Sequence, residues 1–197
     1  MVLGNSFTPS IEKRKNSDHF YYAALFPINK WINKGNYSLS PALIHAFIRQ
    51  ESRFNPNAQN YSGATGLMQL MPSTASYILN SDLYKKPKGQ EQLKNPVFNV
   101  QTGEKYLQEL LKHPAVKGDL LSLIIAYNAG PAKLRRWKTT FSNSLYDPLL
   151  FIESIPYNET RAFVERVVAN YWVYQLQFNE ANKTAMTLAK GKWAKID

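Results

Sequence analysis

The sequence predicts a mainly helical protein, folded as a single domain with a small irregular β or loop region. At Ser40-Pro41 and Asn95-Pro96 a capping side chain precedes a proline, which is typical of a helix start. Apolar residues recur at helical spacing after these starts, as they do between residues 97 and 111. Because 44% of its 197 residues are hydrophobic, the chain has enough apolar surface to bury one sizeable core.

Six helices are expected, and each lies between residues that begin or end helices. Their ranges are 40–52, 72–79, 95–113, 119–127, 131–137 and 159–178. The segment 57–71 carries two glycines among serine, threonine and asparagine, which favours a structured loop or a small β region. Residues 80–94 and 138–156 are expected to be loops, and residues 181–197 a frayed helix or a tail.

The composition excludes several kinds of site. The net charge of +10 favours an anionic partner, but the basic residues form no run long enough for a nucleic-acid-binding arm. The absence of cysteine excludes disulfides and thiolate metal sites, and the three histidines have no metal-binding spacing. No apolar run approaches the roughly 20 residues that a membrane-spanning helix needs. Residues 1–15 lack the order of an export signal.

Glu51 is the candidate for acid–base chemistry in the first of the expected helices. At about 100° per residue it falls inside the apolar arc, between Phe47 and Ile48, whereas His45 and Arg49 fall on the polar face. It also lies near the helix C-terminus, where the macrodipole disfavours negative charge. Burial and dipole both raise the pKa of a carboxyl, as a proton donor near neutral pH requires. From position alone, a glutamate that reaches solvent from a helix end is the competing interpretation.

Four sequence blocks occur in a fixed order around and after Glu51. The first is AFIRQESRFNPNAQNYSGATGLMQLMP, followed by NPVFNVQTGEKYLQELL, AYNAGP and ESIPYNETRAFVERV. Together they resemble the soluble lytic transglycosylases, relatives of goose-type lysozyme, over roughly residues 20–178. The resemblance implies a lysozyme-like fold of the α+β lysozyme superfamily.

The resemblance also implies roles for individual residues. Glu51 would be the catalytic acid and base, and Tyr127 would point its hydroxyl toward that carboxyl. Glu153 would bind substrate without being a second catalytic acid. The family often has serine where this chain has Asn60, whose amide is still able to donate a hydrogen bond. The substrate-binding residues implied in this way are Asn60, Met68, Gln69, Met71, Ala126, Tyr127, Asn128 and Glu153.

The implied reaction is cleavage of the β-1,4 bond between N-acetylmuramic acid and N-acetylglucosamine in peptidoglycan, with formation of 1,6-anhydro-muropeptides. The sequence offers no convincing second catalytic carboxylate near Glu51, which fits ring closure within one sugar better than hydrolysis. Neither a metal nor a cofactor is expected. Peptidoglycan strands are the expected partner, with no nucleic acid and no transmembrane segment, and we expect a monomer. This substrate implies a periplasmic or cell-envelope location, although the chain shows no export signal.

Three segments follow from the same resemblance. Residues 1–36 form a lead-in, similar to the junction with a helical superhelix in larger relatives. Residues 37–180 form the transglycosylase domain, and residues 181–197 form a C-terminal tail.

Other functions remain open on the sequence alone. A hydrolase of lysozyme or chitinase type would use the same Glu51 but would release reducing ends. A glycan-binding protein without activity would keep the groove without needing Glu51 and Tyr127. A nucleic-acid-binding module would use the positive charge, but the sequence contains no binding fingerprint for it.

Overall fold

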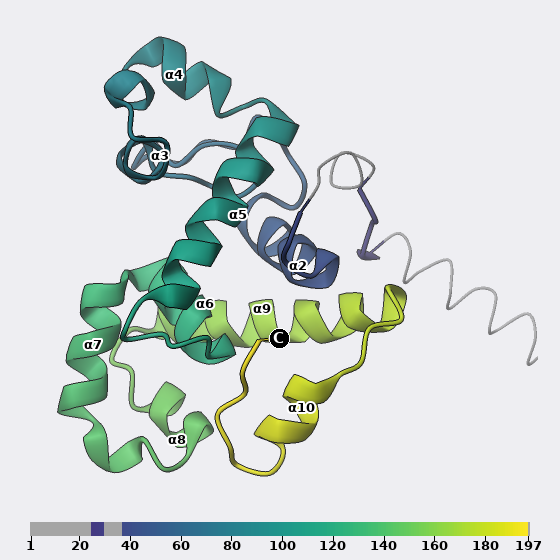
Figure 1. The fold of residues 1–197 in the computed structure, drawn as a ribbon, viewed down its shortest axis with the longest axis vertical. Coiled ribbons are helices and arrows are strands. Elements are labelled where there is room, and N and C mark those ends of the chain that lie inside the picture. Colours follow the sequence, from purple (N-terminus) through teal and green to yellow (C-terminus); the bar gives the residue numbers. More distant parts are fainter. Residues whose placement is uncertain (1–24, 30–36, 197) are drawn as a thin grey trace, which may run out of the picture.

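The computed structural model describes residues 25–29 and 37–196, and these residues are mainly helical (Figure 1). Their β structure is limited to isolated bridges, Gln59 with Thr65, Thr65 with Leu70, and Asp119 with Lys195. The predicted fold class is therefore confirmed. The helices, with η for 3-10 turns, are α2 (Pro41–Ser52), α3 (Pro72–Leu79), η2 (Asp82–Lys85), α4 (Pro87–Gln92), α5 (Pro96–Lys112), α6 (Leu120–Ala129), α7 (Pro131–Thr140), η3 (Ser142–Ser144), α8 (Pro148–Glu153), α9 (Asn158–Gln177) and α10 (Lys183–Leu188).

The segments expected to be loops contain short helices. Residues 80–94 hold η2 and α4, and residues 138–156 hold the end of α7 together with η3 and α8. Each is only one or two turns long, so apolar periodicity does not reveal it. Capping does: Asp147 accepts hydrogen bonds from the backbone N–H groups of Leu149 and Leu150, and Pro148 opens α8.

The core is built around two helices that are buried on nearly every side. Residues 42–48 of α2 and 120–126 of α6 are all buried. Helix α2 packs along the long helix α9, and α6 lies between α5, α7 and α9 (Figure 1). Helix α6 is apolar on all sides, and such a helix is stable only when other elements cover it all round, as α5, α7 and α9 do here.

His45 contradicts the prediction of a polar face on α2. Its side chain is completely buried, against the ring of Tyr174 at 5.1 Å between ring centres. The imidazole Nδ1 lies 2.7 Å from the carbonyl oxygen of Pro41, and the backbone N–H of Asn29 donates to Nε2 at 3.2 Å. Helix α9 and the segment 25–29 cover this face, and a helical wheel of α2 alone contains no information about them.

The C-terminal segment set apart as a tail packs against the domain. The backbone N–H of Leu120 donates to the carbonyl oxygen of Ala194 at 2.9 Å, and Ile196 donates to Gly118 at 2.9 Å. The Trp193 indole donates to the carbonyl oxygen of Leu145 at 2.8 Å. The expected lead-in falls outside the described residues except for 25–29. Within the described part of the chain, no helix has the length and apolar character to cross a membrane.

Candidate active site

Glu51 lies in the last turn of α2, and its side chain is half-buried at one wall of a cleft of about 390 Å³. Six of the nine predicted site residues line this cleft: Glu51, Asn60, Gln69, Met71, Tyr127 and Asn128. The other lining residues are Gln50, Ser62, Ala64, Leu70, Thr74, Tyr106, Glu159 and Phe163. The structure thus assembles residues from α2, the 57–71 loop, α5, α6 and α9 around one carboxyl.

Burial raises the pKa of the Glu51 carboxyl from an ordinary 4.5 to about 8. Among the described residues, no cation and no hydrogen-bond donor contacts this carboxyl to oppose the effect of burial. The carboxyl therefore carries its proton near neutral pH, in a cleft open to a ligand. This is the protonation state that a general acid needs.

Tyr127 lies on α6 beside Glu51. The negative charge of Glu51, after the larger effect of burial, raises the pKa of the Tyr127 hydroxyl well above its ordinary value, so the two groups are near one another. The hydroxyl donates its proton to the backbone carbonyl oxygen of Met68 at 2.6 Å. The resemblance implies a hydroxyl that points toward the Glu51 carboxyl, but its hydrogen bond goes to the loop.

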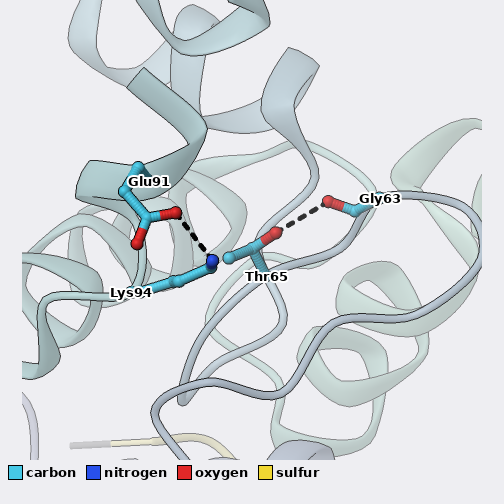
Figure 2. Close-up of polar contacts among 4 residues, drawn as sticks. All are labelled: Gly63, Thr65, Glu91 and Lys94. Atoms are coloured by element: carbon cyan, nitrogen blue, oxygen red, sulfur yellow. Dashed lines mark hydrogen bonds and ion pairs between the residues drawn. The ribbon is translucent and has the colours of Figure 1, made fainter. Parts of the chain in front are cut away.

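The loop at the floor of the cleft is held by its own polar groups. The Gln69 amide nitrogen donates to the carbonyl oxygens of Ala58 at 2.9 Å and Gly66 at 3.0 Å. The Thr65 hydroxyl donates to the carbonyl oxygen of Gly63 at 3.0 Å (Figure 2). Because the Gln69 amide nitrogen is used inside the loop, its carbonyl oxygen is the group left to accept a hydrogen bond from a ligand in the cleft.

Asn99 anchors the same loop from α5, and sequence reasoning missed it. Its completely buried amide accepts from the backbone N–H of Met68 at 2.8 Å. It donates to the carbonyl oxygens of Thr65 at 2.9 Å and Leu93 at 2.8 Å. Gly66 permits this approach, because a Cβ there would lie 2.2 Å from the Asn99 amide nitrogen. The available indication was a lone asparagine on the apolar face of the expected helix 95–113.

The Asn60 side chain is also engaged within the loop. Its carbonyl oxygen accepts from the backbone N–H of Ala64 at 2.9 Å. The amide nitrogen therefore remains to donate into the cleft. Donation from this amide to a ligand is what the resemblance implies for the residue in place of the usual serine, and it stays a prediction.

Three predicted site residues do not line the cleft. The Met68 side chain is completely buried against Gly103, where an added Cβ would lie 2.3 Å from its sulfur. Ala126 is completely buried in α6, and Glu153 is exposed at the end of α8. Each motif block contains both residues that pack in the core and residues that line the cleft. The position of a residue in the motif does not tell which of the two it is.

Glu159, in the same block as Glu153, lines the cleft instead. It lies in the first turn of α9, where the Thr160 hydroxyl donates to the Asn128 side chain at 2.8 Å and joins α9 to α6. Its spacing of four residues from Phe163, another lining residue, was the indication available in the sequence. A second carboxylate therefore shares the cleft with Glu51.

The chain is similar to known proteins. Residues 27–149 match the model of the family described as Transglycosylase SLT domain. A soluble lytic murein transglycosylase of Salmonella typhimurium is 34% identical to this chain. The matched region is 76% of this chain and 22% of that relative. An endo-type membrane-bound lytic murein transglycosylase A of Enterobacter is 35% identical over 74% of this chain and 71% of the relative.

The chain is also similar to a solved structure. The crystal structure of the 70 kDa soluble lytic transglycosylase from Escherichia coli superposes with a TM-score of 0.73 at 27% identity, covering 90% of this chain and 28% of that one. The chain spans about a fifth of the length of the soluble relatives that it matches. The lysozyme-like fold expected from the resemblance is confirmed. With a family model that matches more than half of its length, the chain belongs to the transglycosylase SLT domain family.

Proposed function

We propose that this chain is a lytic transglycosylase domain that cleaves the β-1,4 bond between N-acetylmuramic acid and N-acetylglucosamine in peptidoglycan. The observation that carries the proposal is the Glu51 carboxyl, protonated near neutral pH in a cleft lined by amide side chains. Amides match the N-acetyl and hydroxyl groups of such a glycan as hydrogen-bond donors and acceptors. The family membership supports the same reaction.

Glu51 would act twice in the proposed mechanism. Its carboxyl donates a proton to the bridging oxygen as the bond from that oxygen to muramyl C1 breaks. The muramyl acetamido group stabilises the positive charge that develops at C1. The Glu51 carboxylate then removes the proton of the C6 hydroxyl, whose oxygen attacks C1 and closes the 1,6-anhydro ring. Attack within one sugar gains from proximity and needs no activated water.

Glu159 is the observation that bears on the alternative of hydrolysis. An inverting glycosidase uses a second carboxylate to activate water. The curated relatives do not favour that reaction, since they are transglycosylases by name. In the proposed mechanism the negative charge of Glu159 contributes to the field that stabilises the positive charge at C1.

Product analysis on purified peptidoglycan tests the proposal. Wild type should release muropeptides one water lighter than the hydrolysis products. Glu51→Gln should lower the rate by about 10²- to 10⁴-fold, because the general acid is lost. Glu153→Gln is the matched control: it makes the same chemical change at an exposed position outside the cleft and should keep full activity.

Two outcomes would contradict this assignment. Reducing-end products from wild type would indicate a hydrolase. Anhydro products from Glu51→Gln at a near-wild-type rate would exclude Glu51 as the acid.

The substrate also implies where and how the domain works. We infer a periplasmic or cell-envelope location, where peptidoglycan lies, and cell-wall turnover as the process. We also infer a monomer, with residues 37–180 as the transglycosylase domain. Light scattering on the purified chain measures its mass in solution, and a dimer would overturn the inference of a monomer.

A further inference from the structure

Three lysine ammonium groups gather where the C-terminal segment 189–196 packs against the domain. Burial lowers the pKa of the Lys138 ammonium; Asp119 opposes this effect, and Lys195 and Lys117 add to it. The ammonium groups of Lys195 and Lys117 are therefore near that of Lys138. Both of these residues are exposed, so the concentration of positive charge lies at the surface.

The elements at this end of the molecule carry more positive than negative charge. Helix α7 and residues 189–196 together contain seven lysines and arginines and no acidic residue. Asp119 is buried, and its Oδ1 accepts from the backbone N–H of Ser122 at 2.7 Å. The neighbouring α8 adds two acids, the capping Asp147 and the exposed Glu153. This end of the molecule therefore attracts anions.

The segment beside this charge exposes large apolar side chains. Tyr146, Leu149 and Leu150, in and just before α8, are 76%, 54% and 42% exposed. Phe151 and Ile152 of the same helix are buried in the core. Helix α8 is therefore apolar on its inner face and also on part of its outer face, which no element of the described chain covers.

Trp193 joins the basic and the apolar parts into one surface. Its indole N–H donates to the carbonyl oxygen of Leu145 at 2.8 Å, and its ring centre lies 5.5 Å from that of Phe151. The Lys138 ammonium lies 5.1 Å from the centre of the same indole ring. Helices α7 and α8 and the C-terminal segment thus meet at one end of the molecule (Figure 1).

The combination of charge and exposed leucine indicates the chemistry of a partner. A dissolved polyanion, such as a nucleic acid or a glycan strand with its carboxylates, uses the positive charge but not the leucines. A bilayer of anionic phospholipid uses both, because its phosphates attract ammonium groups and the boundary with its acyl chains accepts apolar side chains. None of these residues lines the candidate cleft, so contact here does not occupy it.

We propose that the surface formed by α7, α8 and residues 189–196 binds an anionic phospholipid bilayer, with the lysines facing lipid phosphates and Leu149 and Leu150 entering the headgroup layer. The chain then lies on the membrane without crossing it. Binding at this surface is separate from the action of Glu51 and keeps the domain beside a membrane while the cleft stays accessible.

Sedimentation of the whole chain with lipid vesicles tests the inference. One kind of vesicle contains phosphatidylcholine alone, and the other is an equal mixture of phosphatidylcholine and phosphatidylglycerol. The first variant carries Lys192→Glu with Lys195→Glu, and the second carries Leu149→Ser with Leu150→Ser. All four side chains are exposed, so both variants should fold, and circular dichroism checks that they do.

Each variant has a matched control elsewhere on the surface. Lys86→Glu with Lys88→Glu makes the same change of charge at exposed positions around the start of α4. Leu83→Ser with Leu176→Ser removes two leucines that are 40% and 72% exposed. Neither control touches α7, α8 or the C-terminal segment.

Wild type should sediment with the mixed vesicles and not with phosphatidylcholine alone, and the bound fraction should fall as salt is added. The lysine variant should lower the partition coefficient into mixed vesicles by at least about tenfold, because two attractive charges become repulsive. The leucine variant should lower it by about 5- to 10-fold, and each control should change it by less than about twofold.

Equal sedimentation of wild type with both kinds of vesicle, or with neither, would overturn the inference. Equal losses in the variants and their controls would overturn it too. A loss in the lysine variant alone would show a surface for polyanions in general instead of a membrane. The assay contains no glycan, so its result does not depend on the proposed function.

Discussion

The Tyr127 hydroxyl donates a 2.6 Å hydrogen bond to the backbone carbonyl oxygen of Met68, and this bond joins α6 to the loop that forms the cleft floor. Its ring lies 4.7 Å from the ring of Phe47 on α2, the helix that ends in Glu51. One side chain thus links the acid, the loop and the core. Its removal should therefore affect both stability and catalysis.

Replacing Tyr127 by phenylalanine keeps the ring and removes the bond. The buried Met68 carbonyl oxygen loses its donor, so we expect a loss of about 1 kcal/mol in unfolding free energy. The rate of anhydro-muropeptide release should fall by about tenfold because the loop is held less firmly. Denaturant titration and product release measure the two effects. Tyr146→Phe, at a 76% exposed position, should change neither stability nor rate. Wild-type stability and rate in Tyr127→Phe would refute the role of this hydrogen bond.

The pH dependence of the reaction should report the Glu51 carboxyl. Burial raises its pKa to about 8, so the acid is protonated below that value and lost above it. We expect kcat/KM to fall about tenfold per pH unit above pH 8. Rates measured from pH 5 to 10 test this, and a decline centred near the ordinary pKa of 4.5 would contradict it.

The same carboxyl should make stability depend on pH. The folded-state pKa of about 8 lies above the ordinary 4.5 of the unfolded chain, so the folded state binds more protons between these values. The contribution of Glu51 to stability is thus complete below pH 4.5 and is lost as pH rises toward 8. Glu51→Gln has no proton to lose. Its Tm relative to wild type should therefore increase from pH 5 to 8, and a constant difference would argue against the raised pKa.

Substitutions at Gly66 and Gly191 distinguish the cost of close packing from the cost of an unfavourable backbone conformation. Both have positive φ, 83° and 67°, but only Gly66 is enclosed: a Cβ there would lie 2.4 Å from the Leu93 carbonyl oxygen. At Gly191 no atom lies within 4 Å of that position. Alanine at 191 should cost about 1 kcal/mol of unfolding free energy, and alanine at 66 should cost more than about 3 kcal/mol. Equal losses in denaturant titrations would show that the enclosure has no effect.

The sequence correctly predicted the helices whose first residues are marked by a capping side chain and a proline. Ser40 and Asn95 cap α2 and α5, each followed by a proline, and both helices begin as expected. Glu51 was placed on an apolar face by spacing within one helix, and the structure confirms its partial burial. Such features depend on neighbours within a few residues, so the sequence contains them directly.

Features that depend on distant segments were missed or misassigned. His45 is buried by α9, which lies more than a hundred residues later in the chain, so its own helix did not reveal the burial. Glu159 lines the cleft because the Thr160–Asn128 hydrogen bond joins the start of α9 to α6, whereas Glu153 is exposed at the end of α8. Local periodicity carries no information about such contacts.

Replacing Asn99 by aspartate tests the contact between α5 and the distant loop. Aspartate has the shape of asparagine but lacks its two side-chain N–H groups. In Asn99→Asp a carboxylate oxygen would face the carbonyl oxygens of Thr65 and Leu93 in place of a donor. We expect a loss of about 3 kcal/mol in unfolding free energy and little anhydro product. The loss should shrink toward pH 4, because a protonated carboxyl regains one of the two donations.

Asn95→Asp is the matched control for this change. The exposed Asn95 caps α5 by accepting from the backbone N–H of Phe98 at 3.0 Å, and aspartate caps a helix equally well. Urea titrations of both variants at pH 7 and pH 4 should therefore show a pH-dependent loss for Asn99→Asp alone. If both variants are equally stable, the buried amide is not what holds the loop beneath Glu51.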